Sequence, residues 1–386
     1  MTFLALLLLA VPTMRALAAP LTLEDAVREA LTAGPAAAVV EAEARAARAE
    51  ARAEAAWENP SLVLDQGVGE SSVIVEVPID PSGLSRSAAA GRARDAVAVR
   101  RDAARAAVGV AVATAYLDAI RADERARVAG DARALAARQG EAARRLLAAG
   151  EVSVADAALL EAEAAASLAR ALETAREATL ARMRLESLLG RTPAGDVDPT
   201  GWPDLPTPPT LDPATLPAVI AADLDARAAL AELAAARLDL LPDLTVGAGP
   251  ALNEGDTGLA WAASIELPLF APRTSPVVAA AGSRDRALAE ADRARLDAAV
   301  ALATATRSFA DARFVAEAYA TVDLRGALST AAAAWEAGEL SLPDWLVRRD
   351  AILDALAASI DARWELGRAN LAVWELAGVL PPEFTP

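Results

Sequence analysis

The stretch from Ser85 to Ala149 contains 65 residues and no proline. Ala, Arg, Glu and Leu dominate it, and all four are strong helix formers. At 1.5 Å per residue, one continuous helix over this stretch would be roughly 98 Å long. A compact globule of 386 residues has no such diameter. The stretch therefore predicts an elongated architecture of long helices, packed in coiled coils.

The same layout occurs twice along the chain. Ala149–Ser153 (AGEVS) matches Ala337–Ser341 (AGELS), which lies 188 positions later. Leu188–Gly190 matches Leu376–Gly378 at the same offset. A unit of this size is far longer than a solenoid repeat, so the pattern predicts an internally duplicated domain.

A proline-rich segment separates the two copies. Residues 190–217 hold eight prolines, which cannot propagate a helix. We therefore divide the chain into a signal peptide at 1–18, a first structural repeat at 19–189, a linker at 190–217 and a second repeat at 218–386. A flexible hinge between independent domains is the alternative for the linker, and the matching sequences on both sides weigh against it.

The N-terminal segment predicts export. An apolar run from Phe3 to Val11 precedes Ala16–Ala18, a small-x-small cleavage pattern that would leave Ala19 as the first mature residue. No cation precedes the apolar run, which departs from the usual form of such signals. No later segment reaches the ~20 consecutive apolar residues of a membrane helix, so we expect any membrane insertion to use strands.

Each copy is expected to contain a helix, two short strands, a very long helix, a tight turn and a return helix. The long helices are predicted at Ser85–Ala149 and Val277–Ala337, and the return helices at Val154–Leu189 and Leu342–Ala377. The strands are predicted at Ser61–Val68, Ser71–Ile79, Asp243–Leu252 and Leu259–Leu269.

The predicted strands alternate between apolar and polar or small residues. In one of them Val73, Val75 and Val77 share a face, and Ile74 and Glu76 lie opposite. Alternating segments of about ten residues suit a transmembrane barrel, although a half-buried hairpin on a soluble domain has the same pattern. Four strands cannot close a barrel of at least eight, so a membrane barrel would require an oligomer.

Several classes of function are disfavoured by composition. The chain has no His, Cys or Lys, so it lacks the imidazole bases, thiolates and amines of most catalytic sites and the usual zinc ligands. Its net charge is −17, and no basic stripe suggests a nucleic-acid partner. We predict a protein that is not an enzyme and has no cofactor or metal site.

The order of local motifs resembles that of the TolC-like outer-membrane efflux family over nearly the whole mature chain. The two Ala-Gly-Glu turns are similar to that family's periplasmic hairpin tips. Other motifs also carry the resemblance. An N-terminal helix pair is indicated by Leu21–Ala26, followed by Ala30-Leu31 and Gly34-Pro35. The entries to strands are similar at Asn59–Leu62 and Leu240–Leu244, and the exits into the long helices at Val77-Pro78 and Leu267–Phe270.

The resemblance implies a mainly α fold with a small β part. Long helical hairpins of a homotrimer would form an α-barrel tunnel, and four strands per chain would contribute to a twelve-stranded β-barrel. The implied function is a passive exit duct in the outer membrane of a Gram-negative bacterium, extending into the periplasm. A periplasmic adaptor would couple the duct to an inner-membrane pump or ABC transporter of an efflux or secretion system.

The resemblance also implies roles for residues at the two turns. The expected adaptor contacts are Gly150, Glu151 and Ser153 with Gly338, Glu339 and Ser341.

Two further pairs of residues near the turns each have two possible interpretations. Trp335 and Trp345 either anchor an adaptor or pack between neighbouring helices. Asp156 and Asp344 each follow a serine by three residues, a pattern that caps a helix start. Both aspartates are also candidates for the family's aperture, and Asp344 matches one of its acidic positions, whereas the second acidic position is occupied by Val347.

Two other classes of protein share features with this sequence. A periplasmic adaptor also has a long hairpin, but the duplication predicts two hairpins in this chain. A soluble coiled-coil scaffold would have no membrane part, which the alternating strands disfavour. Detergent-resistant trimers in the outer-membrane fraction would separate the three classes.

Overall fold

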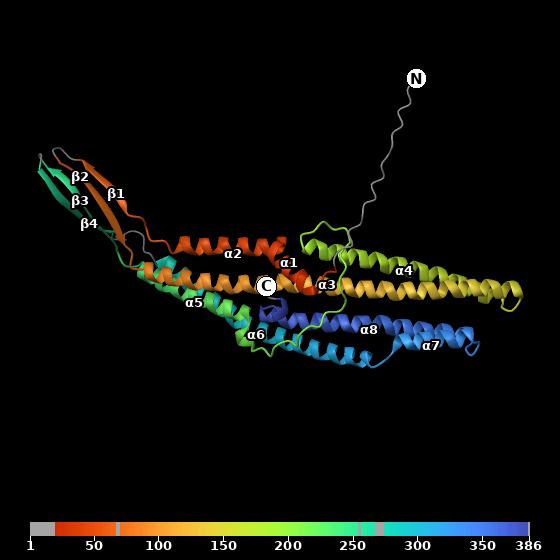
Figure 1. Ribbon diagram of the computed structural model, residues 1–386. Coiled ribbons are helices and arrows are strands. Elements are labelled where there is room, and N and C mark those ends of the chain that lie inside the picture. Colours follow the sequence, from red (N-terminus) through yellow and green to blue (C-terminus); the bar gives the residue numbers. More distant parts are fainter. Residues whose placement is uncertain (1–19, 67–69, 254–255, 267–273, 385–386) are drawn as a thin grey trace, which may run out of the picture. The chain divides into compact units, whose positions relative to one another are not determined.

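The computed structural model describes residues 20–66, 70–253, 256–266 and 274–384. Over these residues the chain is mainly helical and has one antiparallel sheet (Figure 1). The helices are α1 (Leu23–Ala33), α2 (Pro35–Glu54), α3 (Gly83–Ala149), α4 (Val154–Leu188), α5 (Pro217–Leu238), α6 (Thr274–Ala320), α7 (Leu324–Glu336) and α8 (Leu342–Ala377), with short 3-10 turns η1 (Pro213–Thr215) and η2 (Pro382–Phe384). The strands are β1 (Ser61–Gln66), β2 (Glu70–Ile79), β3 (Asp243–Asn253) and β4 (Asp256–Glu266).

The chain divides into two compact units. Unit 1 comprises Met1–Val27, Ala115–Asp204 and Leu324–Ile360, and unit 2 comprises Arg28–Thr114, Leu205–Asp323 and Asp361–Pro386. Unit 1 contains the turn ends of the helical hairpins, and unit 2 contains the sheet. Helices α1, α3 and α8 contribute residues to both units.

The first predicted long helix is confirmed. Helix α3 runs without interruption for 67 residues and ends at Ala149, as expected. The return helices α4 and α8 also match their predicted ranges, with α4 ending one residue early. The predicted N-terminal helix pair corresponds to α1 and α2, which meet at Gly34.

The second predicted long helix is wrong as a single element. Instead of one helix over Val277–Ala337, α6 ends at Ala320 and α7 begins at Leu324. The amide of Val322 bonds to the carbonyl of Tyr319 at 3.2 Å, a tight turn that replaces the α-helical pattern. Two β-branched residues and an Asp occupy the break, and Asp favours a position just before a helix.

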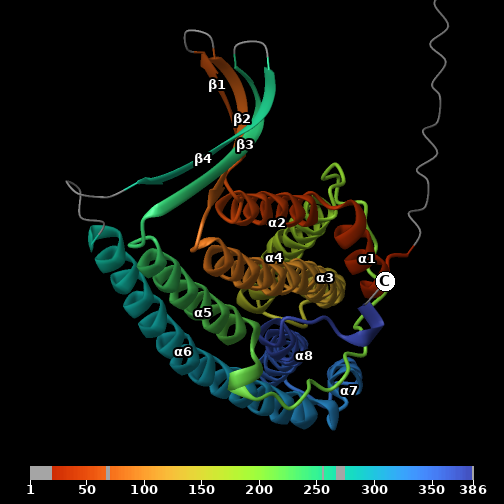
Figure 2. The ribbon, with the colours of Figure 1, turned by 90° about the vertical axis from the view of Figure 1, so that its left-hand side faces the viewer.

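The sheet in unit 2 has the strand order β1-β2-β3-β4, with every neighbouring pair antiparallel (Figure 2). Each predicted strand is present. The ends Val68 and Leu267–Leu269 lie outside the described residues, as do the signal peptide 1–18, Ala19 and the Leu267–Phe270 motif. The duplicated-domain boundaries at 19–189, 190–217 and 218–386 stay a prediction.

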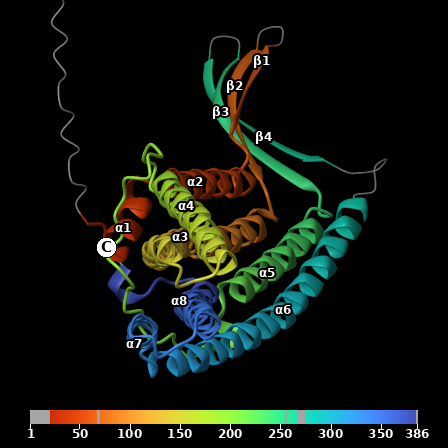
Figure 3. The same cartoon turned by 90° about the vertical axis from the view of Figure 1, so that its right-hand side faces the viewer.

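Small and branched apolar side chains form the helical cores. In unit 2, Leu216 and Val219 pack with Ala298 and Leu302, joining α5 to α6. In unit 1, Ala143 on α3 packs with Ala157 and Leu160 on α4, and two leucines of α8 add to this cluster. Figure 3 shows α3 beside α4 and α7 beside α8 in this unit. Alanine permits such close helix packing because its side chain occupies little space.

Candidate functional site at the hairpin tips

Both predicted tips are built in the same way. Gly150 and Gly338 have φ values of 76°, the left-handed conformation that glycine adopts without a Cβ clash. Each Gly amide bonds to the carbonyl three residues earlier, and the amide of the following Glu bonds to the carbonyl five residues earlier. This pair of bonds is the Schellman motif that ends a helix. The glycines therefore fix the turn, and Glu151 and Glu339 project exposed side chains.

The predicted helix caps are confirmed at both tips. The amide of Asp156 donates to Ser153 Oγ at 3.1 Å, and that hydroxyl donates to the Asp156 carboxylate at 2.7 Å. Ser341 and Asp344 repeat the arrangement at 3.3 and 2.6 Å. Both aspartates are exposed at helix N-termini, where a negative charge is favourable. A role in an aperture stays a prediction.

The two tryptophans near the second tip pack on each other. Trp335 on α7 and Trp345 on α8 stack with ring centroids 6.0 Å apart. Trp345 is fully buried and Trp335 is half-buried. Trp345 therefore packs within this chain, and a role of either ring in an adaptor contact stays a prediction.

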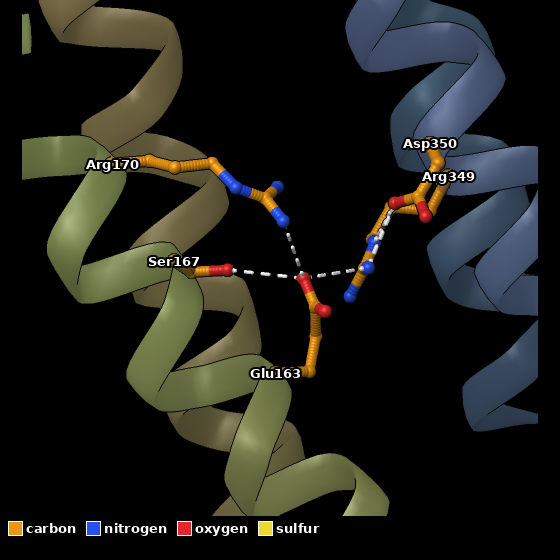
Figure 4. Close-up of polar contacts among 5 residues, drawn as sticks. All are labelled: Glu163, Ser167, Arg170, Arg349 and Asp350. Atoms are coloured by element: carbon orange, nitrogen blue, oxygen red, sulfur yellow. Dashed lines mark hydrogen bonds and ion pairs between the residues drawn. The ribbon is translucent and has the colours of Figure 1, made fainter.

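The structure brings the two hairpins together through a buried ion pair that sequence reasoning missed. Arg349 on α8 is 3% exposed and lies 3.0 Å from Glu163 on α4 (Figure 4). Ser167 donates to the same carboxylate at 3.3 Å, and Arg170 lies 3.9 Å from it. Arg349 also pairs with Asp350 at 2.8 Å. Helical spacing in the sequence could have indicated that Arg349 is buried. It lies on one face of α8 with the buried residues Trp345, Leu356 and Ile360.

A second buried carboxylate organises the start of the linker. Glu186 is 4% exposed, and its two oxygens accept hydrogen bonds from four consecutive backbone amides, Ala194 to Val197, at 2.6 to 3.0 Å. Burial alone raises the pKa of this carboxyl, but the four donors outweigh it and the pKa is lowered. The proline-rich segment is thus held in a defined conformation here.

The chain start is tied to the same segment. Leu21 forms a parallel bridge with Pro199, and the buried Tyr116 hydroxyl donates to the Leu21 carbonyl at 3.0 Å. The amide of Thr200 donates to the same hydroxyl at 3.1 Å. These contacts join α3, the chain start and the linker within unit 1.

The strand register places apolar residues on one face of the sheet. Directly paired residues project to the same side, so Leu62, Val75, Ala248 and Trp261 form one row across all four strands. Apolar residues on this face are well exposed, namely Leu62, Leu64, Val73, Val75, Val77, Ile79, Val246, Leu259, Trp261 and Ile265. The opposite face carries small or polar residues, including Ser72, Glu76, Thr245, Gly247, Ala262 and Ser264.

One helix among the described residues, α3, is long and apolar enough to cross a membrane by length and composition. In its most apolar window, 56% of the residues are buried inside the molecule. Core helices of soluble proteins pass the same test, so this is weak support for a membrane helix. Among the described residues, no group of three or more acidic side chains is placed to hold a metal ion.

The arrangement matches solved outer-membrane channels. The crystal structure of the outer-membrane protein VceC from Vibrio cholerae aligns with a TM-score of 0.75 at 19% identity, covering 92% of this chain and 96% of that one. The Neisseria gonorrhoeae MtrE channel in its open state aligns with a TM-score of 0.70 at 19% identity, covering 92% of this chain and 89% of that one. The Campylobacter jejuni CmeC channel aligns with a TM-score of 0.72 at 15% identity, covering 93% of this chain and 86% of that one.

No protein-family model and no curated protein sequence matches this chain. At identities of 15 to 19% the structural likeness establishes the fold. The chain has the TolC-like fold of these outer-membrane channels, as the sequence motifs predicted.

Proposed function

We propose that three copies of this chain form a passive exit duct in the outer membrane of a Gram-negative bacterium. The observation that carries the proposal is the sheet, which exposes a continuous apolar face and has β1 and β4 as edges. Exposed apolar patches and unpaired edges both require a partner. Three such sheets would close twelve strands with the apolar face toward lipid and the polar face toward a lumen.

The likeness to solved channels supports this proposal over the two alternatives. A periplasmic adaptor or a soluble scaffold would leave the apolar face of β1–β4 without a lipid environment. We infer that the duct extends into the periplasm through its helical hairpins and catalyses no reaction. The exposed tips, with Gly150, Glu151 and Ser153 and their counterparts Gly338, Glu339 and Ser341, would contact a periplasmic adaptor. That adaptor would couple the duct to an inner-membrane pump.

The lipid-facing assignment is tested by placing one charge on either side of β4. Trp261 is 78% exposed on the apolar face, and the adjacent Ala262 points to the other face. We expect Trp261→Arg to destabilise membrane insertion by about 2–4 kcal/mol, the penalty for Arg on a lipid-facing strand near the midplane. Ala262→Arg should insert normally, because its charge enters the lumen.

The measurement is the yield of urea-resistant, detergent-resistant trimers in the outer-membrane fraction. The parent and Ala262→Arg should give trimers, and Trp261→Arg should lose most of them. Recovery of the parent in the soluble periplasm would exclude the duct. Equal yields from the two arginine variants would contradict the assignment of faces.

A second prediction concerns Asp344 and separates charge from helix capping. In the trimer, three Asp344 carboxylates around a narrow opening would favour cations. Single-channel recordings of Asp344→Ala should show higher conductance and lower cation selectivity. The lost cap should also destabilise the start of α8 by about 0.5–2 kcal/mol.

The informative variant is Asp344→Asn, which keeps a short hydrogen-bonding side chain and removes the charge. A charged aperture predicts that Asn and Ala give the same reversal potential. A capping role alone predicts that Asn behaves like the parent. Parent-like selectivity in both variants would remove Asp344 from the aperture.

A further inference from the structure

A groove of about 410 Å³ lies between α3, α4 and α8 in unit 1. Much of its lining is apolar, contributed by Val128, Ala129, Ala132, Leu353, Ala357 and Ile360. Small-molecule sites have similar volumes, about 300–1,000 Å³, and combine apolar lining with a few polar groups. The groove is therefore large enough for a small organic ligand.

The charge in the groove is unbalanced. Glu173 and Glu177 on α4 and Asp354 on α8 line it with exposed carboxylates. None of the three side chains forms an ion pair or hydrogen bond with any other residue that the structure describes. Two arginines also line the groove, so its lining holds three carboxylates and two guanidinium groups and has a net negative charge. Arg170 lies near the Glu163 carboxylate (Figure 4), and Arg125 has a partner within the molecule.

We propose that this groove binds amphipathic organic cations. An apolar body would cover the half-buried lining, and a delocalised positive charge would lie near the three carboxylates. An organic anion of the same shape would meet a lining of net negative charge and should bind more weakly. This goes beyond a passive duct, because it gives the wall of unit 1 a binding site with charge selectivity.

The location gives the site a structural consequence. Ser167 and Arg170 line the groove and also contact Glu163, the carboxylate that pairs with Arg349. A bound cation would therefore contact both α4 and α8, directly beside their buried ion pair. Occupancy should stabilise the contact between the two hairpins.

The test compares two ions of nearly identical shape and opposite charge. Titration calorimetry is performed on the purified full-length protein in a nonionic detergent, with the empty micelle titration subtracted. Tetraphenylphosphonium should bind with one saturable site per chain. Tetraphenylborate should bind at least tenfold more weakly, a difference of about 1.4 kcal/mol.

Charge removal defines the site. The binding of tetraphenylphosphonium should become about tenfold weaker in the triple variant Glu173→Gln, Glu177→Gln, Asp354→Asn. A matched variant, Glu43→Gln, Glu50→Gln, Glu141→Gln, removes the same net charge from exposed positions outside the groove and should bind like the parent. Ala357→Leu fills the groove without changing charge, and it should also weaken binding severalfold.

Several results would overturn the proposal. They are the absence of saturable phosphonium binding, equal affinity for the two ions, an equal loss in the control triple variant, or unchanged binding in Ala357→Leu. Because the titration reports binding to purified protein, its outcome is independent of the trimer and conductance measurements. A failed duct and a failed cation site are therefore distinguishable.

Discussion

Replacing Glu186 with Gln is expected to release the start of the linker from α4. The Gln amide has one carbonyl oxygen, so its NH₂ group faces two of the four backbone amides that the carboxylate now accepts. Each carboxylate oxygen takes one buried and one part-buried N–H donor. Leaving such donors unpaired should cost about 2–4 kcal/mol. We therefore expect amide exchange at residues 194–197 to accelerate by about thirtyfold or more.

The matched control is Glu161→Gln on the same helix. Glu161 also has a partner, Arg144 at 3.3 Å, but both side chains are more than half exposed. Exposed pairs contribute about 0–1 kcal/mol, so exchange at residues 194–197 should not change. Equal protection in the parent and Glu186→Gln would contradict the structural role of this carboxylate.

Glu186 also predicts a dependence on pH. Its pKa lies below the ordinary value of 4.5 in the folded chain, so the folded state favours the charged form. Its stabilisation is complete above pH 4.5 and disappears as the pH falls through the lowered pKa. The parent should lose linker protection over this acidic range. Glu186→Gln should lack this acid-dependent loss of protection. The difference between the amide-exchange profiles of the two proteins therefore separates the contribution of Glu186 from that of other carboxylates.

Removing Glu163 from the Arg349–Glu163 pair is expected to cost much more folding stability than removing Arg349. Glu163→Leu leaves a guanidinium that is 3% exposed with Asp350 as its remaining ion pair. Removing one partner of a buried pair costs about 3–5 kcal/mol. Arg349→Met should cost less, because Glu163 is 22% exposed and keeps Ser167 and Arg170 as neighbours.

The double variant Glu163→Leu, Arg349→Met should recover most of the loss. Apolar replacements of a buried pair are often neutral, since neither charge is left desolvated. Denaturant midpoints of the four proteins give the coupling energy through a double-mutant cycle. The exposed pair Arg144–Glu161 serves as the control cycle and should show little coupling. Additive effects of the two single variants would show that the pair does not join α4 to α8.

The amino-acid sequence determined the features of this protein that depend on neighbouring residues. Alanine-rich stretches without proline beyond the first helical turn predicted α3, α4 and α8, because helix propensity and uninterrupted hydrogen bonding are local properties. The Gly and Ser residues of the tips predicted the turns, since they satisfy backbone groups within a few positions. Alternation predicted the strands and the two faces of each.

Tertiary structure decided whatever required residues far apart in the chain to meet. The helix break before Leu324 opposed a favourable composition, and helix propensity alone did not reveal it. The register between strands depends on residues far apart in the chain, so the single apolar face across β1–β4 emerged only from their pairing. Among 54 acidic residues, nothing local distinguished Glu163 or Glu186. Their importance comes from burial, which removes water and makes each remaining partner count more.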